Sequence, residues 1–121
     1  MLTISASQFK VFEDKAWDAW VAVHIKSLSE LLPDVSARYA PDSWQQLVDG
    51  LLRRADLYGM TLACETEAYC YGSLTLGIGF ESRPDLPWAT AALSKHGEAR
   101  AESLWDGFQS TATEPTPGTF L

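Results

Sequence analysis

The chain has few cysteines and no paired metal-ligand spacing, and these shortages exclude two classes of small domain. Among its 121 residues only Cys64 and Cys70 carry thiols. They stand six positions apart in a segment with helical character, so their side chains project to different sides and cannot bond to each other. A disulfide framework is therefore excluded, and no cysteine pair has the spacing of a zinc site.

Basic residues and long apolar runs are also scarce. Nine Lys and Arg stand against 16 Asp and Glu, for a net charge of −7, and Arg53-Arg54 is the only adjacent basic pair. Nucleic acids and anionic membranes both select clustered cations, so neither is an expected partner. The acidity is explained by solubility, with steering of a basic partner as the alternative.

No apolar segment approaches the roughly 18–20 residues of a membrane span, so no membrane insertion is expected. The first four residues lack the basic region and apolar stretch of a secretory signal. We therefore expect a cytoplasmic protein with reduced cysteines.

What the chain does contain is a series of helical patterns. Ser5 with Gln8 reads as a capping box, and no Gly or Pro follows until Pro33. At about 100° per residue this long helix has two adjacent apolar lanes. The first lane consists of Phe9, Phe12, Ala16, Trp20, Val23 and Leu31, and the second of Trp17, Val21, His24, Leu28 and Leu32. So wide an apolar arc indicates either packing on two sides or a surface that awaits a partner.

The remaining patterns predict shorter helices. A strongly amphipathic helix runs from Pro41 to Tyr58, with Gly59 as its C-cap. A helix capped by Thr61 and running to Leu76 carries Gly72-Ser73 at its middle, which suggests close approach to a neighbouring helix. Short helices are expected at 87–94 and 101–108, with Phe80 as a core plug between helices. The prediction is an all-α single domain over residues 1–108, with a long N-terminal helix and about four shorter ones, followed by a flexible tail over 109–121.

The residues that could carry chemistry all have simpler interpretations. His24 lies on the apolar face and is expected to be a core or interface histidine. Glu65 and Glu67 fit stabilisation of a helix N-terminus better than general acid–base work. Cys64 is interpreted as a packing residue, and Gly77-x-Gly79 lacks the third glycine of a dinucleotide loop. We therefore expect no enzyme activity, no metal site and no cofactor.

The order of these features resembles a family of small bacterial proteins encoded in type VI secretion loci, near genes for spike proteins, effectors and effector adaptors. The resemblance covers residues 4–108. One departure is Leu62-Ala63-Cys64, where family members usually have polar or charged residues. A second is Leu31-Leu32, which is less aromatic than the usual pattern. The matching elements are Ile4 to Gln8, Phe12, Trp20, Leu32-Pro33, Tyr58-Gly59, Thr61, Tyr69, Gly77 to Phe80 and Pro87-Trp88.

The resemblance implies a co-chaperone that assists an adaptor in loading a toxic effector onto the secretion spike. Its expected partners are the adaptor, the effector or the spike protein. The candidate contact surface is the outer edge of the second apolar lane, at Trp17, Val21, Ile25 and Leu32. The alternative for this edge is that other helices of the same chain cover it. If it is a contact surface, Val21→Asp should weaken partner binding and leave the domain folded.

Two other functions stay open at this stage. The first is an immunity protein that neutralises a cognate toxin, since such loci encode these proteins and acidic surfaces often imitate nucleic acid. The scattered acids of this chain form no obvious stripe of that kind. A small hydrolase ranks third, and loss of activity in a folded His24→Ala variant would be its minimum requirement.

Overall fold

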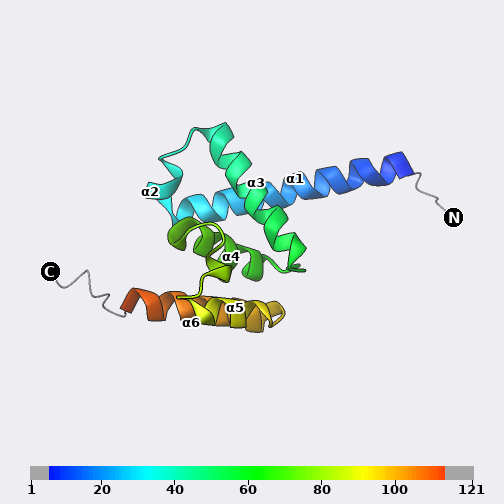
Figure 1. The fold of residues 1–121 in the computed structure, drawn as a ribbon. Coiled ribbons are helices and arrows are strands. Elements are labelled where there is room, and N and C mark those ends of the chain that lie inside the picture. The colour runs from blue at the N-terminus through cyan, green and yellow to red at the C-terminus, as the bar shows by residue number, and fades with distance from the viewer. Residues whose placement is uncertain (1–5, 114–121) are drawn as a thin grey trace. The chain divides into compact units, whose positions relative to one another are not determined.

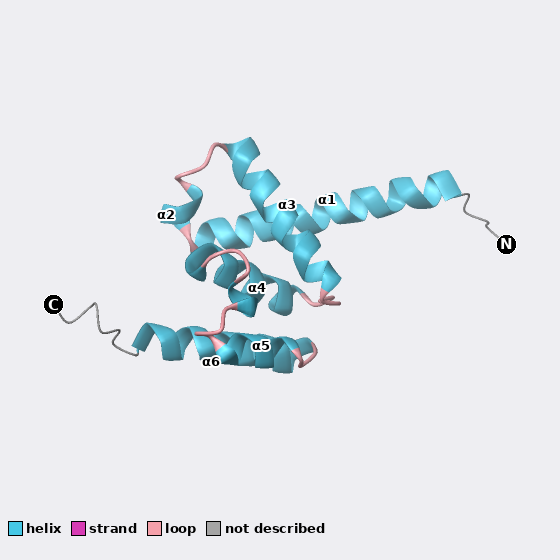
Figure 2. Cartoon of the chain, in the orientation of Figure 1, coloured by secondary structure: helices cyan, strands magenta, loops and turns pink. Residues whose placement is uncertain are grey.

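The computed structural model describes residues 6–113, and every regular element in that range is helical (Figures 1 and 2). The predicted all-α class is therefore confirmed. The elements are α1 (Ala6–Leu31), α2 (Pro33–Ser36), α3 (Pro41–Leu57), α4 (Ala63–Leu76), the 3₁₀ turn η1 (Phe80–Ser82), α5 (Pro87–Leu93) and α6 (Gly97–Thr113).

The contacts divide the chain into two compact units, Met1–Gly50 and Leu51–Leu121. The first unit contains α1, α2 and the N-terminal part of α3. The second contains the rest of α3, then α4 to α6. The expected single domain over residues 1–108 stays a prediction.

The first unit includes the second apolar lane of α1. Val21, His24 and Leu28 are buried there. Two indole groups tie α1 to α3: Trp44 Nε1 donates to Ser29 Oγ at 3.0 Å, and Trp17 Nε1 donates to an Asp49 carboxylate oxygen at 2.6 Å. These bonds satisfy the polar edge of each ring while its apolar body packs.

The short helix α2 was not expected, because Pro33 was interpreted as the end of the first helix only. Proline is well tolerated at the first position of a helix, where its missing N–H has no intrahelical partner to bond. Leu32, just before it, leaves helical geometry at φ −130° and ψ 61°. The backbone then resumes with Ser36 N donating to Leu32 O at 2.9 Å. One proline therefore ends α1 and begins α2.

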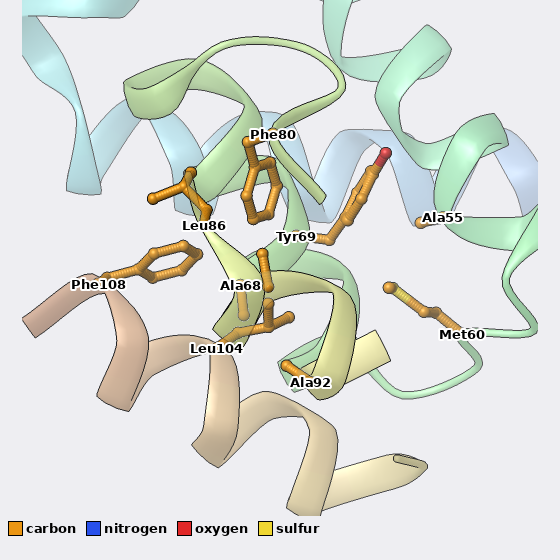
Figure 3. Close-up of a cluster of buried hydrophobic side chains, with 10 residues drawn as sticks. Ala55, Met60, Ala68, Tyr69, Phe80, Leu86, Ala92, Leu104 and Phe108 are labelled. Carbon is orange, nitrogen blue, oxygen red and sulfur yellow. The ribbon is translucent and has the colours of Figure 1, made fainter. Parts of the chain in front are cut away.

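The second unit has an aromatic core, with Phe80 completely buried as the predicted plug. Its ring centroid lies 5.7 Å from that of Tyr69 and 5.9 Å from that of Phe108, and Figure 3 shows these side chains converging. A Cβ on Gly72 would lie 2.5 Å from the Phe80 ring and 2.7 Å from the Phe108 ring. The close approach expected at Gly72 is thus made by two aromatic rings, and only a glycine leaves room for them.

The start of α4 differs from the prediction. Thr61 was expected to cap the helix through its hydroxyl, but the N-cap residue is Leu62, with an extended backbone. The capping acceptor is instead the side chain of Glu65, which takes the backbone N–H groups of Thr61 and Leu62, each at 3.1 Å. A charged carboxylate is a stronger acceptor than a threonine hydroxyl. The helix end of α4 is as expected, with Gly77 at φ 110°.

The last helix is longer than predicted at both ends. It begins at Gly97, which has a φ of 61°, rather than at Ala101. It also continues through Gln109 to Thr113, so the first five residues of the expected tail are helical. Residues 114–121, the rest of that tail, lie outside the described range, as does the expected cap at Ser5.

Candidate functional site

An exposed apolar strip follows one side of α1, along the first of its two lanes. Val23 is 58% exposed and Leu31 43% exposed, Ala16 is exposed, and Trp20 between them is half-buried. We call Ala16, Trp20, Val23 and Leu31 the α1 strip. Large apolar side chains exposed in a line are a feature of protein contact surfaces. The two N-terminal members of the lane, Phe9 and Phe12, have side chains outside the described part.

None of the four contact residues predicted from the sequence belongs to the α1 strip. Val21 is only 4% exposed and belongs to the interior. Trp17, Ile25 and Leu32 are half-buried, and the Trp17 indole is engaged by Asp49. The edge named from the sequence is therefore largely covered within the chain. Because Val21 is buried, Val21→Asp would bury a charge and is expected to destabilise the fold.

The choice between the two lanes was beyond the sequence. Both are apolar, and they are separated by only about 100° on the helix surface. The one polar residue in the second lane, His24, was expected to be a core or interface histidine. His24 is 1% exposed, and its Nδ1 lies 2.8 Å from the Trp20 carbonyl oxygen, as expected for a core histidine.

A buried polar cluster in the second unit centres on Glu81 of η1. One carboxylate oxygen, Oε2, accepts hydrogen bonds from Tyr69 Oη at 2.7 Å, from Tyr58 Oη at 2.8 Å and from Arg54 Nη2 at 3.2 Å. Arg54 Nε also donates to the Tyr69 hydroxyl oxygen at 3.1 Å, and the Thr90 hydroxyl donates to the Glu81 backbone carbonyl at 2.6 Å. The cluster thereby joins the C-terminal part of α3, α4, η1 and α5.

The charge state of this cluster follows from its contacts. Burial alone would raise the pKa of Glu81, but the hydrogen bonds from the two tyrosines and the charge of Arg54 overcome burial and lower it. Burial and the bond to Glu81 raise the pKa of Tyr69 far above its usual value, and the same two causes raise the pKa of Tyr58. The tyrosines therefore stay protonated donors to an ionised carboxylate. This arrangement fixes positions and holds no proton ready for transfer near neutral pH.

A second buried cluster pairs Glu65 with Arg100. Both side chains are 2% exposed, and Arg100 Nη1 lies 3.3 Å from Glu65 Oε1. The same Oε1 accepts the backbone N–H of Gly97 at 2.7 Å, and Arg100 Nε donates to the Lys95 carbonyl at 2.6 Å. Burial would raise the pKa of Glu65, but three backbone N–H groups and Arg100 lower it. Glu65 thus holds the first turns of α4 and α6 together.

The two cysteines and His96 are the remaining candidates from the sequence. Both cysteines are free, as expected: Cys64 is exposed, and Cys70 is buried, with a pKa raised to about 12 by burial and by the charge of Glu67. His96 is exposed, and its Nδ1 lies 3.4 Å from Arg100 Nη2. In the described range no three metal-binding side chains come together, and no helix there is both long and apolar enough to cross a membrane.

The two buried clusters, around Glu81 and around Glu65 with Arg100, were not predicted from the sequence. Glu81 and Arg100 fall at positions without helical periodicity or a motif, and the only signal was that Glu65 stands at the start of a helix. Their assembly requires residues 12 to 35 positions apart to meet. Comparison with protein-family models, with curated proteins and with solved structures finds no match to this chain.

Proposed function

We propose that this chain is a non-catalytic protein-binding factor that uses the α1 strip, and that it serves as a co-chaperone in loading a type VI secretion effector through its adaptor. The observation that carries the protein-binding part is the exposure of Val23 and Leu31 beside half-buried Trp20 on one side of a long helix. Exposed aromatic and aliphatic side chains on a helix are the anchors that a partner groove or helix recognises.

The secretion context rests on the order of sequence elements described above, from Ile4 to Trp88. The acidic composition, with a net charge of −7, supports fast association with a basic partner, because complementary charges steer the encounter of two proteins. An adaptor with a basic surface around an apolar groove fits both features.

The experiment is affinity purification of the tagged protein from its native host, in three forms. The wild-type protein should recover an adaptor together with an effector or spike protein. Val23→Asp places a charge in the middle of the α1 strip and should lose them. Ile78→Asp is the matched control, because Ile78 is 59% exposed and lies in the turn before η1, away from the strip in sequence. It should recover the same proteins as the wild type.

Function is then measured by deleting the gene and following the effector. A co-chaperone predicts that the effector becomes unstable or is not secreted, and that wild-type protein but not Val23→Asp restores it. Recovery of a toxin alone, with protection of cells that express this toxin, would replace the proposal with an immunity function. Equal recovery of partners by Val23→Asp and wild type would remove the α1 strip from the interface.

A further inference from the structure

The residues that border the α1 strip on its solvent side have a charge pattern of their own. Each member of the strip is preceded by a residue displaced by about 100° around the helix, so these preceding residues form a second line beside the strip. The line has small side chains in its middle and opposite charges at its ends. We call it the α1 flank; its members are Lys15, Ala19, Ala22 and Glu30, all of them exposed.

The α1 flank is complementary to itself when its direction is reversed. The midpoint between Lys15 and Glu30 falls between Ala22 and Val23. When two antiparallel α1 helices are related by a twofold axis at this midpoint, Lys15 of each copy faces Glu30 of the other. Val23, which is 58% exposed, then lies beside the axis and meets its equivalent. Because the axis generates each contact twice, one complementary pair of residues gives two ion pairs.

A parallel arrangement of the same two helices is unfavourable. It would set Lys15 against Lys15 and Glu30 against Glu30, and charges that flank an apolar seam decide the orientation of paired helices. The antiparallel arrangement has no such conflict. Lys26, which lies on the same side of the helix, faces Ala19 of the other copy, a small side chain over which the apolar stem of a lysine can lie.

We propose that the α1 strip binds a second copy of this chain, through antiparallel pairing of two α1 helices about an axis between Ala22 and Val23. The pairing covers Val23 and the half-buried Trp20, and it leaves the paired charges at the rim. It involves α1 alone and does not rest on the function proposed above. An adaptor that uses the same strip binds by displacing the second copy.

Sedimentation equilibrium of the full chain over a series of concentrations tests the dimer. The wild-type protein should pass from monomer to dimer as the concentration rises. Val23→Asp places two carboxylates beside the axis and should stay monomeric, whereas the control Ile78→Asp should associate like the wild type. A wild-type chain that is monomeric throughout the series, or a Val23→Asp dimer of equal strength, would overturn the proposal and would leave the adaptor as the candidate occupant of the strip.

Reversal of the charges tests the register of the two helices. Lys15→Glu should weaken the dimer about tenfold, because two attractive pairs at the rim become two repulsive ones. The double variant Lys15→Glu, Glu30→Lys restores both pairs with their signs exchanged, and its dissociation constant should return to within about threefold of the wild-type value. A double variant that dimerises as weakly as Lys15→Glu would show that these residues do not meet, and would overturn the pairing.

Disulfide cross-linking tests the direction of the helices, in a chain whose exposed native thiol is removed by Cys64→Ser. Val23→Cys brings two thiols together beside the axis, so a mild oxidant should link the copies. Ala16→Cys is the matched control from the same strip, because antiparallel pairing separates its two thiols by about 20 Å along the helices, at about 1.5 Å per residue. It should stay unlinked. Cross-linking of Ala16→Cys as fast as that of Val23→Cys would indicate a parallel pair and overturn the proposal.

Discussion

The removal of Glu65 is the sharpest test of what holds the second unit together. In Glu65→Ala the carboxylate disappears from the start of α4, and with it the acceptor for the backbone N–H groups of Thr61, Leu62 and Gly97. Arg100 stays behind with 2% of its side chain exposed. Its guanidinium then has no charged partner in a place that water does not reach.

The expected change in the free energy of unfolding follows from these lost interactions. Removing one partner of a buried ion pair costs about 3–5 kcal/mol, because the other charge is left uncompensated. The three backbone donors add to this to the extent that water cannot reach them, at about 1 kcal/mol each. We therefore expect Glu65→Ala to lower the free energy of unfolding by at least about 4 kcal/mol, a large part of the roughly 5–15 kcal/mol of an ordinary domain.

Urea unfolding followed by far-ultraviolet circular dichroism measures this change as a shift of the midpoint to lower urea. Glu67→Ala is the control, because Glu67 lies two residues further along the same helix and is half-buried. It should change the free energy of unfolding by less than about 1 kcal/mol. The double variant Glu65→Ala, Arg100→Met removes both charges and should be more stable than Glu65→Ala alone. A loss below about 1 kcal/mol in Glu65→Ala, or a double variant less stable than the single one, would refute this account of the pair.

Three further predictions concern the same unit. Tyr69→Phe removes a hydroxyl that donates to Glu81 at 2.7 Å, and urea unfolding should show a loss of about 2 kcal/mol, as for a buried hydrogen bond to a charged group; an unchanged midpoint would show that the bond is not made. The pKa values of Glu65 and Glu81 are lowered by folding, so their contribution is present above the unfolded pKa of about 4.3 and is lost as the pH falls through the folded pKa values. The urea midpoint should accordingly fall in acid, and a midpoint that rises below pH ~4 would contradict the sign. Finally, a thiol reagent at neutral pH should label exposed Cys64 in the native protein and reach Cys70 only after unfolding, with mass spectrometry of the digested protein as the measurement; rapid labelling of both would contradict the burial.

The helical class and most helix positions could be predicted because they depend on interactions between near neighbours. The amphipathic pattern of α3 and the glycine after α4 are local signals, and both agree with the structure. Local signals failed where a distant or stronger group intervened. Glu65 displaced Thr61 as the capping group, and Arg100 with Gly97 belongs to a helical turn that begins four residues before the predicted start of that helix.

The contact surface predicted on α1 differs in position from the residues of that helix that are exposed. The sequence indicated an over-wide apolar face on α1, which is correct, and chose the lane that contains Val21. The structure buries Val21 and exposes Val23. These positions are two apart along the helix, with only Ala22 between them, and both are valines, so no property of the residues themselves distinguishes them. Which of them faces water depends on the side from which the rest of the chain packs.

By itself, then, the sequence determined the helices, their apolar faces and the positions where glycine or proline breaks the pattern, since periodicity and backbone preference act within a few residues. Tertiary structure alone decided which lane of α1 stays exposed. It also decided that Glu81 gathers two tyrosines and an arginine, and that Glu65 is paired with Arg100. These features depend on segments far apart in the chain being brought together, and the free energy of burying a charge or an apolar side chain is defined only once its surroundings exist.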